Sequence, residues 1–119
     1  MKKINDKMRK RLKRKASIRK SISGTAERPR MTVYKSNRFT YVQAIDDTAG
    51  VTLAAASNRE KAHLDITNKV ASLAKLGEII GERLKAKNIK AVVFDRNGYR
   101  YHGKVKAIAD GARKAGISL

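Results

Sequence analysis

Residues 90–104 read KAVVFDRNGYRYHGK, and this stretch decides the fold. Residues 91–94 form a continuous apolar run, which is typical of a strand buried on both faces of a sheet. A helical pattern precedes the run, so we expect a crossover that makes this strand parallel to an earlier one. Asn97 and Gly98 then predict a tight turn, followed by a loop of basic and aromatic residues.

A helix is predicted before this strand. Apolar and small residues recur there at steps of three and four, namely Ile66, Val70, Leu73, Gly77, Ile80 and Leu84. Asp65 or Thr67 would cap its start. Each interior glycine costs about 1 kcal/mol relative to alanine. We therefore expect Gly77 and Gly81 to mark close packing of the helix backbone on the sheet.

A second helix is predicted after the loop. Its buried stripe consists of Val105, Ile108, Ala109 and Ala112. Gly116 is the expected stop, since glycine commonly follows the last turn of a helix.

Three strands are expected upstream, in residues 28–36 (RPRMTVYKS), 37–46 (NRFTYVQAID) and 51–57 (VTLAAAS). Asp46, Asp47 and Gly50 form the turn between the last two. The short connections favour an antiparallel meander. The fold class is therefore mixed α/β (α+β) with order β-β-β-α-β-α, in which both helices pack on one face. The other face of the sheet is expected to be open, with Tyr41 and Gln43 on it.

The charge of the chain is extreme. Its 119 residues carry 29 Lys and Arg against 10 Asp and Glu, a formal net charge of +19. A compact monomer with this charge repels itself, so a polyanionic partner is expected, with nucleic acid the first candidate.

The basic residues concentrate at the N-terminus. Residues 1–20 hold eleven Lys and Arg and a single acid, Asp6. We predict a basic arm and linker over residues 1–27, disordered alone and ordered on RNA. A globular RNA-binding domain is predicted over residues 28–119. The free protein is expected to be a monomer.

Several function classes lack support in the sequence. The chain has no cysteine, which excludes disulfides, Cys-ligated zinc and thiol catalysis. Neither a secretory signal nor a long apolar run is seen. A phosphate-binding glycine motif is also absent from the sequence. We expect no cofactor.

The loop after residue 94 admits two readings. Asp46, Asp47 and Asp95 follow strands and could hold Mg²⁺, with His102 as a base, but the carboxylates equally suit turns and arginine pairs. As a binding loop, Arg96 and Arg100 would project outward to phosphate. Tyr99, Tyr101 and His102 could stack on bases, and Lys104 opens a helix N-terminus that favours an anion. We favour binding and expect no catalytic or metal site, with Asp95 bracing arginine.

Four stretches resemble the bacterial large-subunit ribosomal proteins of the family numbered eighteen, which binds 5S rRNA. They are GTAERPRMTVYKS, YVQAIDD, TLAAAS and above all VVFDRNGYRYHGKVKAIADGARKAGI. The resemblance implies a non-enzymatic protein of the cytoplasmic ribosome. Its partners would be 5S rRNA, 23S rRNA and neighbouring large-subunit proteins, and it would attach 5S rRNA to the central protuberance.

The residues expected to bind RNA come from the arm, the first strand and the loop. In the arm they are Arg9, Lys10, Arg11, Lys13, Arg14, Lys15, Arg19 and Lys20. Near the first strand they are Arg28, Arg30 and Lys35. In the loop they are Arg96, Tyr99, Arg100, His102 and Lys104. The alternatives are a general nucleic-acid-compacting protein, a magnesium-dependent nuclease and a peripheral membrane binder.

Overall fold

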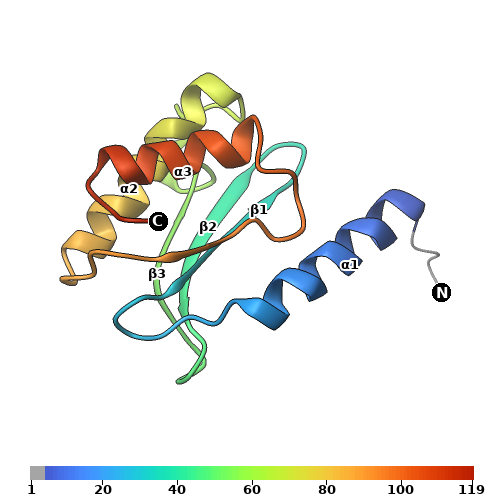
Figure 1. Ribbon diagram of the computed structural model, residues 1–119. Coiled ribbons are helices and arrows are strands. Elements are labelled where there is room, and N and C mark those ends of the chain that lie inside the picture. Colours follow the sequence, from blue (N-terminus) through green and yellow to red (C-terminus); the bar gives the residue numbers. More distant parts are fainter. Residues whose placement is uncertain (1–4) are drawn as a thin grey trace.

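The structure is a computed structural model that describes residues 5–119. The first four residues of the predicted arm lie outside this range. A four-stranded sheet forms the centre (Figure 1). Its strands are β1 (Arg30–Lys35), β2 (Thr40–Asp46), β3 (Val51–Ser57) and β4 (Val93–Asp95). Its helices are α1 (Asp6–Ser21), α2 (Val70–Lys85) and α3 (Lys104–Lys114), and a short 3-10 turn, η1, spans Lys61–His63.

The sheet is mixed, as expected. The strand order is β3-β2-β1-β4; β1–β2 and β2–β3 are antiparallel, and β1–β4 is parallel. The parallel pair confirms the crossover inferred from the helix that precedes residues 91–94. One prediction is wrong, because β4 is an edge strand in which Val93 and Phe94 are only partly buried.

The core lies between the sheet and the α2–α3 pair. Alternate residues of β1 and β2 point into it, and the fully buried examples are Met31, Val33, Val42 and Ala44. The helices contribute Leu73, Leu76, Ile80, Leu84, Ile108 and Ala112. Both helices cover one face of the sheet, which confirms the expected layering, and α1 extends from the other side (Figure 1).

The α2 helix begins later than predicted. It starts at Val70, and neither Asp65 nor Thr67 caps it, since Lys69 is the N-cap and makes no side-chain cap bond. Two asparagines hold the preceding segment in another conformation. Asn58 donates to the carbonyl of Ile66 at 3.2 Å, and Asn68 donates to the carbonyl of Ser36 at 3.0 Å. These bonds keep Ile66 and the residues after it out of the helix, which therefore starts only at Val70.

The glycines inside α2 pack against a helix rather than against the sheet. A Cβ built on Gly77 would lie within 3.0 Å of the Ile108 backbone in α3. On the other side, a Cβ on Gly111 would meet the carbonyl of Ala74 equally closely. Close approach is therefore the reason for these glycines, as expected, but its partner is α3. The predicted stop of α3 is confirmed at Gly116, which has φ +99°.

Candidate nucleic-acid interface

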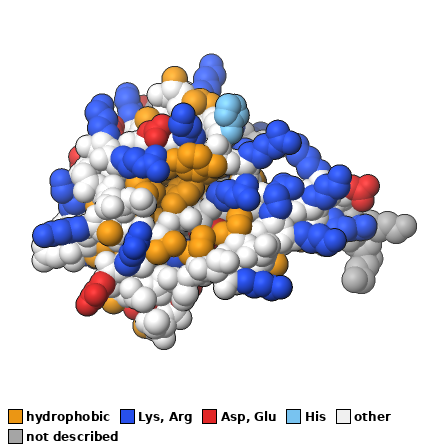
Figure 2. Space-filling view, viewed as in Figure 1, with side chains coloured by type: hydrophobic (Ala, Val, Ile, Leu, Met, Phe, Trp, Pro, Cys, Tyr) orange, Lys and Arg blue, Asp and Glu red, His pale blue; other side chains and the backbone are white. Residues whose placement is uncertain are grey.

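The α1 helix is a cationic rod attached to the sheet. Its sixteen residues include nine Lys and Arg, and none of them is buried. Three positions are partly buried, at a spacing of four and then three: Arg11, Lys15 and Ile18. This spacing puts them on one face of the helix, turned toward the rest of the protein. Figure 2 shows blue basic side chains along α1 and over the neighbouring surface.

The Asn97–Gly98 turn is the part of the domain to which the middle of α1 is hydrogen-bonded. The Arg11 Nε donates to the Asn97 carbonyl at 3.2 Å, and the Arg14 Nε donates to the Gly98 carbonyl at 2.9 Å. Both turn residues have positive φ, 54° and 76°. A Cβ on Gly98 would lie within 3.0 Å of the Arg11 carbonyl oxygen. The turn therefore fixes the middle of α1 and depends on glycine for the close approach.

Tyr99 joins α1 to β1. The Arg11 guanidinium carbon lies 4.1 Å from the centre of the Tyr99 ring, and the Lys35 Nζ lies 5.0 Å from it. The Tyr99 hydroxyl lies 3.3 Å from the Lys35 carbonyl, to which it donates. Tyr99, which was expected to contact RNA, is thus partly buried and holds two of the predicted RNA-binding cations in place.

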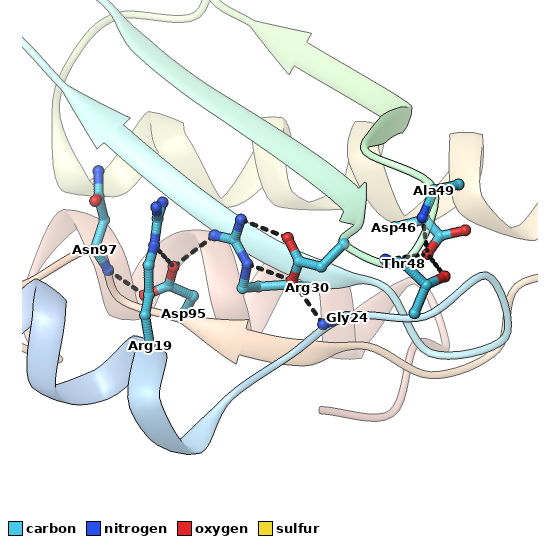
Figure 3. A network of polar contacts seen from close by, with 9 residues as sticks. Arg19, Gly24, Arg30, Asp46, Thr48, Ala49, Asp95 and Asn97 are labelled. Carbon is cyan, nitrogen blue, oxygen red and sulfur yellow. Dashed lines mark hydrogen bonds and ion pairs between the residues drawn. The ribbon is translucent and has the colours of Figure 1, made fainter.

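Arg30 is the hub of a polar network rather than a surface cation (Figure 3). Only 6% exposed, it donates through Nε to the Asp47 Oδ2 at 2.9 Å and through NH1 to the Asp95 Oδ2 at 2.8 Å. The Arg19 Nε of α1 lies 3.6 Å from the same Asp95 oxygen. Arg30 was expected to contact RNA, and its guanidinium is buried and paired with two carboxylates. The expectation that Asp95 braces arginine is confirmed.

The acid Asp47 fixes the root of α1. Its Oδ2 accepts from the Gly24 amide at 2.7 Å, and its own amide donates to the Gly24 carbonyl at 3.0 Å. A Cβ on Gly24 would collide with the Arg30 amide and the Ile45 carbonyl. The hydrogen bond from Arg30 lowers the pKa of Asp47 to about 2, and the bond from the Gly24 amide adds to this effect. The Gly24–Asp47 anchor was missed in the sequence, where the only signal was a glycine in a polar linker.

Positive charge accumulates between α1 and the domain. Burial lowers the pKa of Lys15, and the neighbouring charges of Arg19 and Arg11 lower it further. Burial also lowers the pKa of Lys35, and the charges of Lys104, Lys7 and Arg11 add to that effect. Lys7 was not among the predicted residues. The charged forms of Lys15 and Lys35 are therefore disfavoured in this seam between α1 and the domain, and a nearby anion would stabilise them.

The remaining predicted residues differ in their access to solvent. Those classed as exposed are Arg9, Lys10, Lys13, Arg14, Arg19, Lys20, Arg28, Arg100 and His102. Arg96 and Lys104 are partly buried. Arg96 folds back and donates to the Tyr99 carbonyl at 3.1 Å, so its expected outward projection is wrong, whereas Arg100 is exposed as expected. Tyr101 is exposed and accepts from Arg113 at 2.8 Å.

The carboxylates do not gather into a metal site. Across residues 5–119, no group of three His, Asp or Glu side chains is arranged to hold a metal ion. Asp46 instead caps its own turn, accepting from the Thr48 amide at 3.0 Å. In the same range, no helix is long and apolar enough to span a membrane.

The chain resembles one family along nearly its whole length. Residues 5–119 match the family model described as "Ribosomal L18 of archaea, bacteria, mitoch. and chloroplast". The "Large ribosomal subunit protein uL18" of Treponema denticola is 66% identical, over 99% of this chain and 98% of the relative. The protein of the same name from Treponema pallidum is 56% identical, over 100% and 99%. That from Lysinibacillus sphaericus is 52% identical, over 96% of each chain.

Proposed function

The chain belongs to the L18 family of large-subunit ribosomal proteins, and we propose that it binds 5S rRNA, contacts 23S rRNA and attaches the 5S particle to the central protuberance. As a member of this family it is a structural, non-enzymatic component of the large ribosomal subunit, and it works in the cytoplasm as part of the ribosome. Its partners are rRNA and other ribosomal proteins.

The observation that carries this proposal is the docked cationic helix. α1 is held at its root by Gly24 and at its middle by the Asn97–Gly98 turn. Its solvent side carries Arg9, Lys10, Lys13 and Lys20, all exposed. A fixed row of cations suits the phosphate backbone of folded RNA, whose recognition depends on shape and phosphate contacts.

We also propose that RNA stabilises the position of α1. The contacts that hold it are few, and the seam beneath it concentrates Lys15, Lys35 and Arg11 with Asp95 as the nearby acid. Phosphates at the seam would offset this repulsion. In that case the helix signal in circular dichroism rises when 5S rRNA is added, after subtraction of the RNA spectrum; an unchanged signal would mean that α1 is fully ordered alone.

The test is competition binding. Labelled 5S rRNA is titrated with the purified protein at near-physiological salt and magnesium, with unlabelled 5S rRNA, tRNA and duplex DNA as competitors. We expect 5S rRNA to compete at least tenfold better than tRNA or DNA. Equal competition by all three would overturn the proposal in favour of a general nucleic-acid-compacting protein.

A further inference from the structure

A hollow lies on the sheet face that the α2–α3 pair leaves uncovered. Its volume is about 250 Å³, and its lining comes from alternate residues of two neighbouring strands: Thr32 and Tyr34 in β1, and Tyr41 and Gln43 in β2. The register pairs Thr32 with Gln43 and Tyr34 with Tyr41 across these strands. Tyr41 and Gln43 were expected on this open face, and the structure confirms both, while Thr32 and Tyr34 were not anticipated.

Two aromatic rings line the hollow. The ring centres of Tyr34 and Tyr41 lie 6.2 Å apart, and the rings are tilted by 45°. Tyr34 lies near the end of β1, beyond the residues that pair with β4, and is 50% exposed. Neither hydroxyl makes a hydrogen bond within residues 5–119, so these rings do not serve as polar links inside the fold. A flat partner would find a ring face available here.

One of the residues that line the hollow carries an unpartnered polar atom. Thr32 is only 9% exposed, and its Oγ1 is buried without a hydrogen-bond partner among the described residues. Buried hydroxyls are nearly always hydrogen-bonded, so an unpartnered hydroxyl on a residue that lines a hollow suggests a ligand that completes it. The Gln43 amide beside it supplies both a donor and an acceptor.

The α1 helix borders the hollow on its β4 side. Asp95 is the register partner of Thr32 in β4, so it lies on the same sheet face. Arg19 of α1 reaches Asp95 on that face, and Figure 3 shows α1 in front of the sheet with the other helices behind it. The helix therefore covers the β4 side and leaves the β1–β2 side open, next to a row of cations that attracts nucleic acid.

We propose that this hollow binds one unpaired nucleobase of ribosomal RNA. The base stacks on Tyr34 and Tyr41, and its edge hydrogen-bonds to the Thr32 hydroxyl and the Gln43 amide. Single-stranded loops and bulges present bases in this way, and aromatic side chains are their usual platform. Drug-sized ligands occupy pockets of about 300–1,000 Å³, so the smaller hollow suits a single ring system. The inference rests on the proposed role in rRNA binding.

The first experiment separates ring stacking from other contacts. The Tyr34→Leu/Tyr41→Leu variant keeps apolar bulk but removes both ring faces, whereas Tyr34→Phe/Tyr41→Phe keeps them. Affinity for 5S rRNA and for 23S rRNA fragments is measured over a salt series, with thermal unfolding as the folding check. On the RNA that supplies the base, we expect the leucine pair to bind about tenfold more weakly, and the phenylalanine pair to restore most of that loss. The slope of log affinity against log salt should stay unchanged, because no phosphate contact is removed.

A second variant tests the orphan hydroxyl. Thr32→Val keeps the shape of the side chain and removes its oxygen. Since the hydroxyl has no partner in the fold, the variant should unfold at the same temperature as the wild type or at a higher one. It should nevertheless bind the RNA several-fold more weakly. A purely structural role for Thr32 would not move stability and affinity in opposite directions.

The outcomes distinguish this inference from the broader proposal. If the wild type selects 5S rRNA but the leucine pair matches it on every RNA, the base site is wrong and the 5S assignment stands. If the wild type shows no preference for 5S rRNA but the leucine pair loses affinity for a 23S fragment with an unchanged salt slope, the base site stands and the 5S assignment fails. Normal RNA binding combined with loss of a neighbouring ribosomal protein would reassign the hollow to a protein side chain.

Discussion

Arg30 joins distant parts of the chain through two carboxylates. Its guanidinium bonds to Asp47 and Asp95, which in turn contact Gly24 and Asn97. The two points that attach α1 to the domain, Gly24 and the turn at Asn97, therefore both depend on the Arg30 side chain. Arginine suits this role because its planar fork serves two carboxylates at once.

Replacing this side chain should destabilise the domain strongly. Arg30→Ala leaves the fully buried Asp95 without its strongest partner, and breaking such a pair costs about 3–5 kcal/mol. Urea denaturation followed by circular dichroism measures the loss. The matched control is Arg28→Ala, at an exposed position two residues away, which should change stability by about 0.5 kcal/mol or less while weakening RNA binding. Equal losses in the two variants would contradict the buried role of Arg30.

The free energy of unfolding should also depend on pH through the Asp47 carboxylate. Its pKa is about 2 in the folded protein against 3.8 ordinarily. A depressed folded pKa means stabilisation that is complete above about pH 5 and lost as the pH falls toward 2. The free energy of unfolding should therefore decline between pH 5 and pH 2. Asp47→Asn removes this contribution, so its decline should be shallower; parallel curves would exclude Asp47 as a source.

Gly98 should control the docking of α1 without controlling the core. In Gly98→Ala, the new Cβ meets the backbone of Arg11, so the helix must move. Gly50→Ala is the matched control, because Gly50 has a similar φ of +67° but nothing within 4 Å of the Cβ position. Hydrogen exchange of α1 amides should accelerate at least tenfold more in the first variant than in the second. Equal exchange would show that the turn does not seat the helix.

At the scale of elements, α2 and α3 pack backbone to backbone. Gly77 and Gly111 face the opposite helix, and neither has room for a methyl group. Alanine normally favours a helix interior by about 1 kcal/mol over glycine. Here we expect the opposite sign: Gly77→Ala and Gly111→Ala should each lower the free energy of unfolding by about 1–3 kcal/mol. A stabilised variant, measured by urea denaturation, would mean that the helices separate at little cost.

The elements themselves could be predicted because periodicity and turn residues are local signals. The alternation in residues 30–35 and the stripe through Leu73, Ile80 and Leu84 give β1 and α2 directly. The failures arose from distant contacts. The start of α2 depends on Asn58 and Asn68, whose partners lie up to thirty-two residues away, and the burial of Arg30 depends on Asp95, sixty-five residues downstream. Spacing along the chain does not encode such partners.

For the whole molecule, charge placement should matter more than total charge. Arg9→Gln/Lys13→Gln and Lys75→Gln/Lys90→Gln each lower the net charge of +19 by two, the first pair on α1 and the second on the α2 side. All four positions are exposed. The α1 pair should reduce the salt slope of 5S rRNA binding by about 2, at about 1 for each phosphate contact. The second pair should leave the slope nearly unchanged; equal reductions would indicate a diffuse electrostatic attraction.

The Gly24–Asp47 anchor makes α1 a lever with its fulcrum at the sheet. Sixteen helical residues extend about 24 Å at 1.5 Å per residue. If the Asn97–Gly98 turn released the middle of α1, a tilt of about 10° at Gly24 would swing the far end by roughly 4 Å, more than the length of a hydrogen bond. The angle at which the Gly24–Asp47 anchor holds α1 therefore contributes to the position of the N-terminal end of the helix. The Asp47 carboxylate, through its bonds to Gly24 and Arg30, thus helps to determine the position of the most distant cations of α1.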